Sequence, residues 1–112
     1  MAYREEEDSV VFHSGNYYSV NQLLEAVEHI SIHRVNVQLF AGHIKPGDLD
    51  PKRIAAADIT KPIIYCDDPV WGLVVLDGAH RVAKAMLKAG VQTIPAKKIP
   101  HQWLKPIKHK GA

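Results

Sequence analysis

The spacing of apolar residues first predicts a hairpin and a helix. Residues 10–12 and 17–18 are short apolar runs around a Ser-Gly-Asn sequence at residues 14–16, which predicts a hairpin or a bent strand. Apolar residues then recur at the i, i+3, i+4 and i+7 positions from residue 20 to residue 27, the spacing of one helix face. Ser19 and Gln22 fit a capping box at its start. We expect this helix to end near Ile30.

The period of the pattern changes after this helix. Val35, Val37 and Leu39 alternate with their neighbours, which predicts a strand over residues 33–40 with one buried face. Asp50 followed by Pro51 predicts the start of a short helix that reaches residue 57, because proline is favoured at the first helical position. Residues 63–66 are a short apolar strand.

The second half of the chain completes the pattern. Residues 71–76 are apolar apart from Gly72, which predicts a central strand covered on both faces. Residues 79–87 carry apolar side chains at helical spacing, and Gly90 predicts the stop. Residues 94–99 predict a last strand, placed at an edge because it contains Pro95. Trp103, with Leu104, is the expected anchor of the segment that follows. The order predicts a single small α+β (α/β) domain with a mixed sheet and about three helices.

Composition narrows the class of protein. The chain has 112 residues, 46% of them hydrophobic and 23% charged, which is typical of one folded domain rather than a disordered chain. No run approaches the roughly 20 apolar residues of a spanning helix, so no membrane association is expected. The N-terminus lacks the apolar core of a signal peptide, and Cys66 is the only cysteine, so we expect no intrachain disulfide and a cytoplasmic location.

The charges are segregated along the chain. Residues 1–8 hold four acids and one arginine and predict a flexible acidic end, whereas residues 97–112 hold five lysines, two histidines and no acid. We therefore divide the chain into an acidic segment at residues 1–8, a domain at residues 9–100 and a basic tail at residues 101–112. The tail from Lys105 to Lys110 is expected to be solvated, and DNA or an acidic protein is its candidate partner.

The junction at residues 77–81 is the candidate site. A strand delivers Asp77-Gly78-Ala79-His80-Arg81 to the start of a helix, where backbone N–H groups lack acceptors and the dipole is positive. A cation at this helix end is unfavourable by about 0.3–1 kcal/mol unless an anion offsets it. A phosphate would do so, bound by backbone N–H groups, the imidazole and the guanidinium, with Lys84 one turn further on.

Structural interpretations of the same residues stay open beside the phosphate site. Asp77 could cap the helix and pair with Arg81, and Gly78 could serve only a tight strand–helix turn. The Asp67-Asp68-Pro69 sequence is interpreted as an ordinary turn rather than a metal site. No dedicated metal site is predicted, because the helix before His33 ends too early for His29 and His33 to share a helix face.

Residues 74–85, followed by Gly90 and by Ile94-Pro95-Ala96, resemble the core of the ParB/sulfiredoxin superfamily. The similarity spans about residues 32–100. It implies that Gly78, Ala79, His80 and Arg81 cradle the phosphates of a nucleotide: ATP, ADP or CTP, with Mg²⁺ as a candidate cofactor. Asp77 would orient the ligand or contact it through the metal, and His80 would be the general acid/base of an NTPase, phosphotransferase or nuclease. Asp48 and Asp50 are the candidate acidic partners.

The departures from the family pattern limit the activity. Sulfiredoxin carries its reactive cysteine where this chain has Ala79, so sulfiredoxin chemistry is not expected. Only about a dozen residues follow the core, so a complete chromosome-partition protein is not expected either. The alternative function is a non-catalytic DNA- or protein-binding accessory module of a phage or plasmid. Loss of turnover in His80→Ala would favour catalysis, and loss of affinity on removal of the Lys105–Lys110 charges would favour the module.

Overall fold

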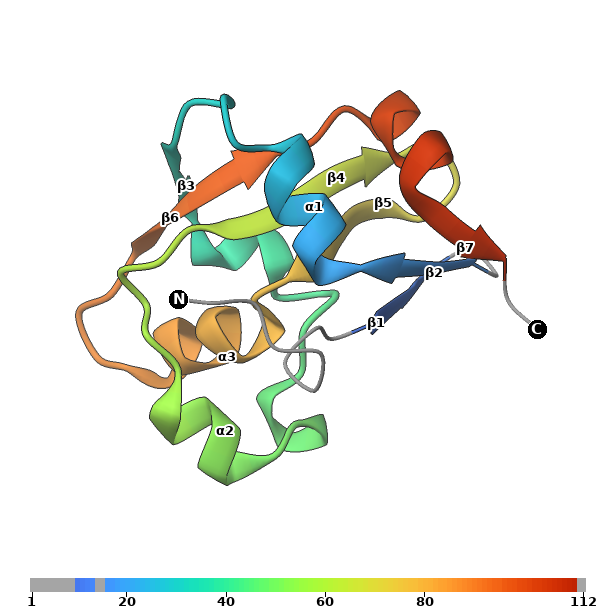
Figure 1. The fold of residues 1–112 in the computed structure, drawn as a ribbon. Helices are drawn as coiled ribbons and strands as arrows, with labels where there is room; N and C mark the ends of the chain where they lie inside the picture. The colour runs from blue at the N-terminus through green and yellow to red at the C-terminus, as the bar shows by residue number, and fades with distance from the viewer. Residues whose placement is uncertain (1–9, 14–15, 111–112) are drawn as a thin grey trace.

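The computed structural model describes residues 10–13 and 16–110, and the side-chain surroundings of residues 19–104. The expected hairpin at the start, the helix after Ser19 and the helix after Gly78 are confirmed (Figure 1). The strands are β1 (Val10–His13), β2 (Asn16–Ser19), β3 (His33–Asn36), β4 (Ile63–Asp68), β5 (Gly72–Asp77), β6 (Thr93–Lys98) and β7 (Lys108–Lys110). The helices are α1 (Val20–Ala26), α2 (Pro51–Ala56) and α3 (Ala79–Leu87), and the 3₁₀ turns are η2 (Val37–Phe40), η3 (Pro46–Asp48) and η4 (His101–Ile107).

The strands form two sheets in an α+β fold, which confirms the predicted class. The larger sheet is mixed and has the order β3-β6-β4-β5, with β4 and β6 parallel and the other pairs antiparallel. The smaller sheet, β1-β2-β7, is antiparallel. Helices α2 and α3 lie together on one side of the larger sheet, and α1 and η4 lie on the other (Figure 1).

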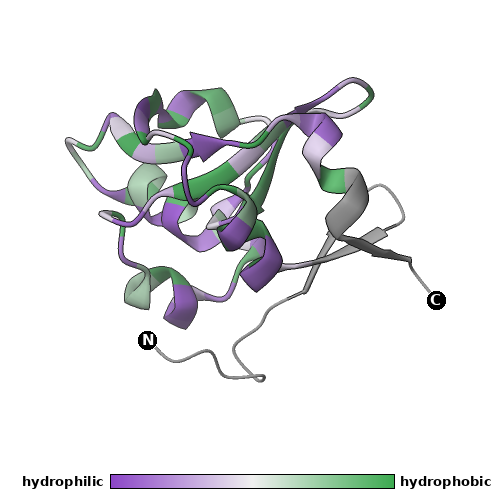
Figure 2. Ribbon diagram, turned by 45° about the horizontal axis from the view of Figure 1, so that its top comes forward, coloured by the Kyte–Doolittle hydropathy of each residue, from purple (hydrophilic) through white to green (hydrophobic). Residues whose placement is uncertain are grey.

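Strand β4 separates the two halves of the hydrophobic core. Its side chains alternate, so Ile63 and Tyr65 face α3 and η2, whereas Ile64 and Cys66 face α1 and η4. All four are buried, and Figure 2 shows hydrophobic residues along the strands of the larger sheet. A strand buried on both faces is an almost continuous apolar run, as residues 63–66 are in the sequence.

The positions of two strands differ from the prediction. Strand β5, expected at the centre, is an edge strand of the larger sheet, and β6, expected at an edge, is interior. The Leu73–Val75 side chains of β5 are only partly buried, so its apolar run does not mean cover on both faces. Pro95 is tolerated inside β6 because the parallel pairing with β4 starts one residue later, at Ala96.

The prediction of a strand over residues 33–40 is also wrong in its second half. It ends at Asn36, whose side-chain Oδ1 accepts a hydrogen bond from the Gln38 backbone N–H at 2.9 Å. That bond turns the chain into η2, as short Asn side chains do when they compete with the sheet ladder. As a result Phe40 is fully buried, whereas Leu39 is half exposed.

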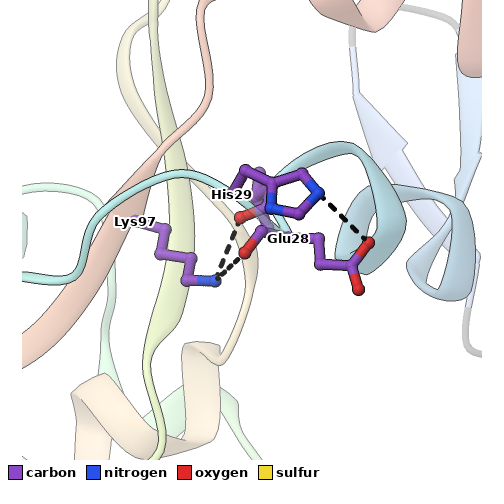
Figure 3. Close-up of polar contacts among 4 residues, drawn as sticks. Glu28, His29 and Lys97 are labelled. Atoms are coloured by element: carbon purple, nitrogen blue, oxygen red, sulfur yellow. Dashed lines mark hydrogen bonds and ion pairs between the residues drawn. The ribbon is translucent and has the colours of Figure 1, made fainter.

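The first helix, α1, is shorter than predicted. It begins as expected, with Ser19 Oγ accepting a hydrogen bond from the Gln22 N–H at 3.4 Å, but its last residue is Ala26 rather than one near Ile30. The amino group of Lys97 on β6 donates to the carbonyls of Val27 at 3.0 Å and Glu28 at 3.5 Å, which would otherwise accept from the next turn (Figure 3). The neighbouring Glu28–His29 pair is 3.9 Å apart and largely exposed, so it contributes little (Figure 3).

The C-terminal segment is built onto both sheets. Leu104, not Trp103, is its buried anchor: Leu104 is 2% exposed and packs beside Leu23 and Ile99, whereas Trp103 is 46% exposed. Residues 101–110, predicted as a basic tail, form η4 and β7, and β7 pairs with β2. Within residues 10–13 and 16–110, none of the helices has both the length and the apolar character needed to cross a membrane.

Candidate functional site

The candidate site lies where β5 passes into α3. The strand ends at Asp77, and Gly78 takes a left-handed conformation (φ +103°) as the N-cap, without a side-chain cap. The first helical hydrogen bond runs from the Val82 N–H to the Gly78 carbonyl at 3.0 Å. The backbone N–H groups of Ala79, His80 and Arg81 therefore have no acceptor within the helix, and the positive end of the helix dipole lies at the same place.

A hollow of about 260 Å³ opens at this junction, between α2 and α3. Its lining combines two guanidinium groups, an imidazole and one carboxylate. The lining residues are Arg53, Ala56, Ala57, Asp77, Gly78, His80 and Arg81. Four of the predicted site residues are thus brought together, and the charge around the hollow is predominantly positive.

Arg81 is held in place by the protein itself. Its Nη1 donates to the Pro62 carbonyl at 2.7 Å, just before β4, and its Nη2 lies 3.6 Å from Asp77 Oδ2. Both side chains of this i, i+4 pair are about four-fifths buried. The pairing of Asp77 with Arg81, one of the open structural alternatives, is therefore present. Arg81 borders the hollow with part of its donors already engaged.

Gly78 is required by packing. A Cβ added there would lie 2.7 Å from Ile63 Cγ2 and 3.1 Å from Arg81 Nη1. Real Cβ atoms do not approach carbon that closely, and the positive φ is itself unfavourable for a residue with a side chain. The tight strand–helix turn therefore explains this glycine without a ligand.

The remaining predicted residues divide into those near the hollow and those turned elsewhere. Lys84 Nζ donates to the carbonyls of Ala55 and Ala57, each at 2.8 Å, so it caps the C-terminus of α2 and does not line the hollow. Asp50 is the N-cap of α2, as predicted, and accepts from the Lys52 N–H at 2.9 Å. Asp48 lies exposed in η3 and does not line the hollow, and Ala79 opens α3.

The surroundings of His80 favour its neutral form. Partial burial lowers the pKa of the imidazole most, the positive charge of Arg53 lowers it further, and the carboxylate of Asp50 acts in the opposite direction. His80 is therefore uncharged at neutral pH, with one nitrogen able to donate and the other to accept. An anion in the hollow would reverse this balance.

Arg53 is the lining residue that the sequence did not indicate. It lies in the last turn of α2, which packs on α3 near the start of that helix. Nothing in the local sequence distinguishes it from Lys52, and only the docking of the two helices brings it to the hollow. The one available signal is a short basic helix just before the Lys61-Pro62-Ile63 sequence.

Two other groups are committed to structure. Asp68 is buried, and its Oδ1 accepts from the N–H groups of Val70 at 2.7 Å and Trp71 at 2.9 Å, so Asp67-Asp68-Pro69 is the predicted turn. The other carboxylate oxygen of Asp68, Oδ2, lies 3.4 Å from the imidazole Nε2 of His101. Burial raises the pKa of the Cys66 thiol to about 11, so this cysteine is protonated and unreactive at neutral pH.

The lining of the hollow offers little to a metal ion. Asp77 is its one carboxylate and is paired with Arg81, so Mg²⁺ would find at most one carboxylate ligand here, with phosphate oxygens and water completing the shell. Within the described part of the chain, no cluster of three or more His, Cys, Asp or Glu side chains is placed to bind a metal.

The basic residues proposed to contact DNA or an acidic protein cannot be placed in the same way. The backbone of Lys108–Lys110 forms β7, but the side chains of residues 105–110 lie outside the described ones, as does the acidic segment at residues 1–8.

Comparison of the chain with protein-family models, with curated proteins and with solved structures gave no significant match.

Proposed function

We propose that this protein binds the phosphate groups of a nucleotide in the hollow between α2 and α3, as a ParB/sulfiredoxin-like domain. The observation that carries the proposal is the convergence of Arg53, His80 and Arg81 with the N-terminus of α3 around one hollow. Arg53 has no anionic partner among the described residues, and a phosphate would supply one beside the neutral imidazole and the Asp77-paired Arg81. Backbone N–H groups at a helix start and guanidinium groups are both standard phosphate donors.

The size of the hollow limits how much of a nucleotide it encloses. At about 260 Å³ it is smaller than the roughly 300–1,000 Å³ pockets that enclose drug-sized ligands. The phosphates would therefore enter, and the base would remain outside or on the rim. ATP, ADP, CTP and GTP would then differ through their phosphates more than through their bases.

The proposal concerns binding first, and turnover only as an extension of it. His80 is the neutral group in the hollow that could accept a proton, and Asp77 would first have to leave Arg81. Hydrolysis or transfer of phosphate would therefore depend on His80, and His80→Gln would abolish turnover while α3 remains folded. A cytoplasmic location agrees with a nucleotide ligand.

Thermal unfolding with added ligand tests the proposal. At 100 times its dissociation constant a ligand stabilises the folded state by about 2.7 kcal/mol, which raises the Tm of a domain of this size by several degrees. We expect similar shifts with ATP, CTP, GTP and inorganic tripolyphosphate, and a smaller shift with orthophosphate. No shift with any of them, with or without Mg²⁺, would contradict the proposal and direct attention to DNA or an acidic protein as the partner.

The pH dependence of binding provides a second test. A bound anion stabilises the imidazolium of His80, so its pKa is higher in the complex than in the free protein, where it is lowered. Binding then takes up a proton, and affinity increases as pH falls through the bound-state pKa and levels off below the free-state pKa. The measurement is tripolyphosphate affinity by calorimetry between pH 8 and pH 5, in about half-unit steps across the ordinary His pKa near 6.5.

His80→Gln is the control for this test, because it retains only the titration of the ligand itself. The difference between the two pH profiles belongs to His80. Identical profiles in the wild type and the variant would show that the imidazole does not face the bound anion.

A further inference from the structure

We infer that Arg53, rather than Arg81, supplies the guanidinium group that binds the ligand's phosphate in this hollow. The inference rests on the proposed function and deepens it. It assigns the direct contact to a residue on α2 and gives Arg81 the role of a positioning residue at the start of α3. The sequence alone favours the opposite assignment, because Arg81 belongs to the Asp77–Arg81 junction.

The donors of the two other cations near the hollow, Arg81 and Lys84, are already partly engaged. Arg81 uses Nη1 on the Pro62 carbonyl and holds Nη2 beside Asp77. Lys84 uses its amino group on the carbonyls of Ala55 and Ala57. A phosphate bound by either would have to share a head group whose short hydrogen bonds already hold it toward other parts of the protein.

Arg53 differs from both in this respect. Its side chain lines the hollow, yet in the part of the chain that the structure describes its guanidinium has no hydrogen bond or ion pair. Its charge nevertheless reaches His80 across the hollow. A guanidinium with all five N–H donors available, facing an imidazole and a helix start, is arranged for a planar, two-point contact with phosphate.

A structural role for Arg53 predicts a different result. A cation in the last turn of α2 is favoured by the helix dipole whether or not a ligand is present. Lys52 provides the matched control, because it lies next to Arg53 on the same exposed helix, carries the same charge and does not line the hollow. Arg53→Gln and Lys52→Gln change the net charge equally, so a general electrostatic effect would appear in both.

The experiment measures tripolyphosphate and ATP affinity by calorimetry in the wild type, Arg53→Gln, Arg53→Lys and Lys52→Gln. We expect affinity to fall by about 30-fold or more in Arg53→Gln and by less than about threefold in Lys52→Gln. Arg53→Lys should recover part of the loss, because an ammonium group keeps the charge but not the fork. Denaturant unfolding should give the same midpoint for all four proteins, and the His80 pKa in the free protein should rise in Arg53→Gln alone.

Each contrary result has a distinct meaning. Wild-type affinity retained in Arg53→Gln would overturn the inference and leave the proposed function standing. Equal losses in Arg53→Gln and Lys52→Gln would reduce the effect to net charge and overturn it as well. Absence of binding by the wild type would overturn the proposed function itself.

Discussion

Gly78→Ala is expected to lower the free energy of unfolding by about 3 kcal/mol. Two costs combine at this position. An alanine at the left-handed φ of +103° costs about 1–2 kcal/mol, and forcing its Cβ to within 2.7 Å of Ile63 Cγ2 adds about 1–3 kcal/mol of overpacking. Ile63 is fully buried on β4 and belongs to the core beneath α3, so it has no free space to move into. Urea denaturation of the two proteins measures the difference.

Gly90→Ala separates the two costs. Gly90 also has a positive φ, +84°, but a Cβ there meets nothing within 4 Å, so only the conformational cost of about 1–2 kcal/mol is expected. A Gly78→Ala protein no less stable than Gly90→Ala would mean that the start of α3 does not pack on β4 as described. Ile63→Ala combined with Gly78→Ala should cost less than the two separate losses together, because the smaller side chain relieves the clash.

The elements with local signals could be predicted from the sequence. Helix α2 begins where Asp50 and Pro51 indicate, because capping and the fixed φ of proline act within a few residues. Helix α3 follows its apolar stripe and the glycine before it. The turn at Asp68 forms because the Asp68 side chain accepts hydrogen bonds from the N–H groups of Val70 and Trp71. These features need no knowledge of the rest of the fold.

The errors arise where distant residues decide the outcome. Helix α1 ends early beside Lys97, which is 70 residues away from Val27 in the sequence. The exchange of β5 and β6 between edge and interior depends on strand order, which apolar content alone does not specify. Pro95 indicated an edge, yet the start of the β4 ladder one residue later leaves room for it.

The residues of the candidate site also divide into those with local sequence signals and those placed by distant contacts. The sequence locates the junction at Asp77, Gly78 and His80 because strand, glycine and helix are contiguous there. It does not indicate Arg53 or the bonds from Lys84 to the carbonyls of Ala55 and Ala57, because both depend on how α2 docks against α3. A guanidinium or an amino group offers a ligand only the donors that carbonyls of the same protein leave free, and that information lies in the tertiary structure.

Arg81→Gln is expected to destabilise the protein by about 2 kcal/mol in the absence of any ligand. The substitution removes a charge-assisted hydrogen bond to the Pro62 carbonyl, a class of bond that contributes about 1.5–3 kcal/mol, and leaves Asp77, about one-fifth exposed, without its cation. Removal of a cation from the positive end of α3 offsets part of this loss, by about 0.3–1 kcal/mol. Chemical denaturation without phosphate in the buffer measures the net effect.

The comparison with Arg53 gives this prediction its meaning for the site. Arg53→Gln should leave the free energy of unfolding within about 0.5 kcal/mol of the wild-type value, since Arg53 is exposed and its guanidinium bonds to none of the described residues. Arg81→Lys should be intermediate, because one ammonium group does not reproduce the fork that reaches both Pro62 and Asp77. If Arg81→Gln proved as stable as the wild type, its donors would not be bound to the fold, and Arg81 would again be the first candidate for the phosphate contact. The two substitutions therefore distinguish the roles of the two arginines. We expect loss of Arg81 to weaken the fold, because Arg81 holds α3 in place, and loss of Arg53 to weaken only binding, because Arg53 faces the ligand.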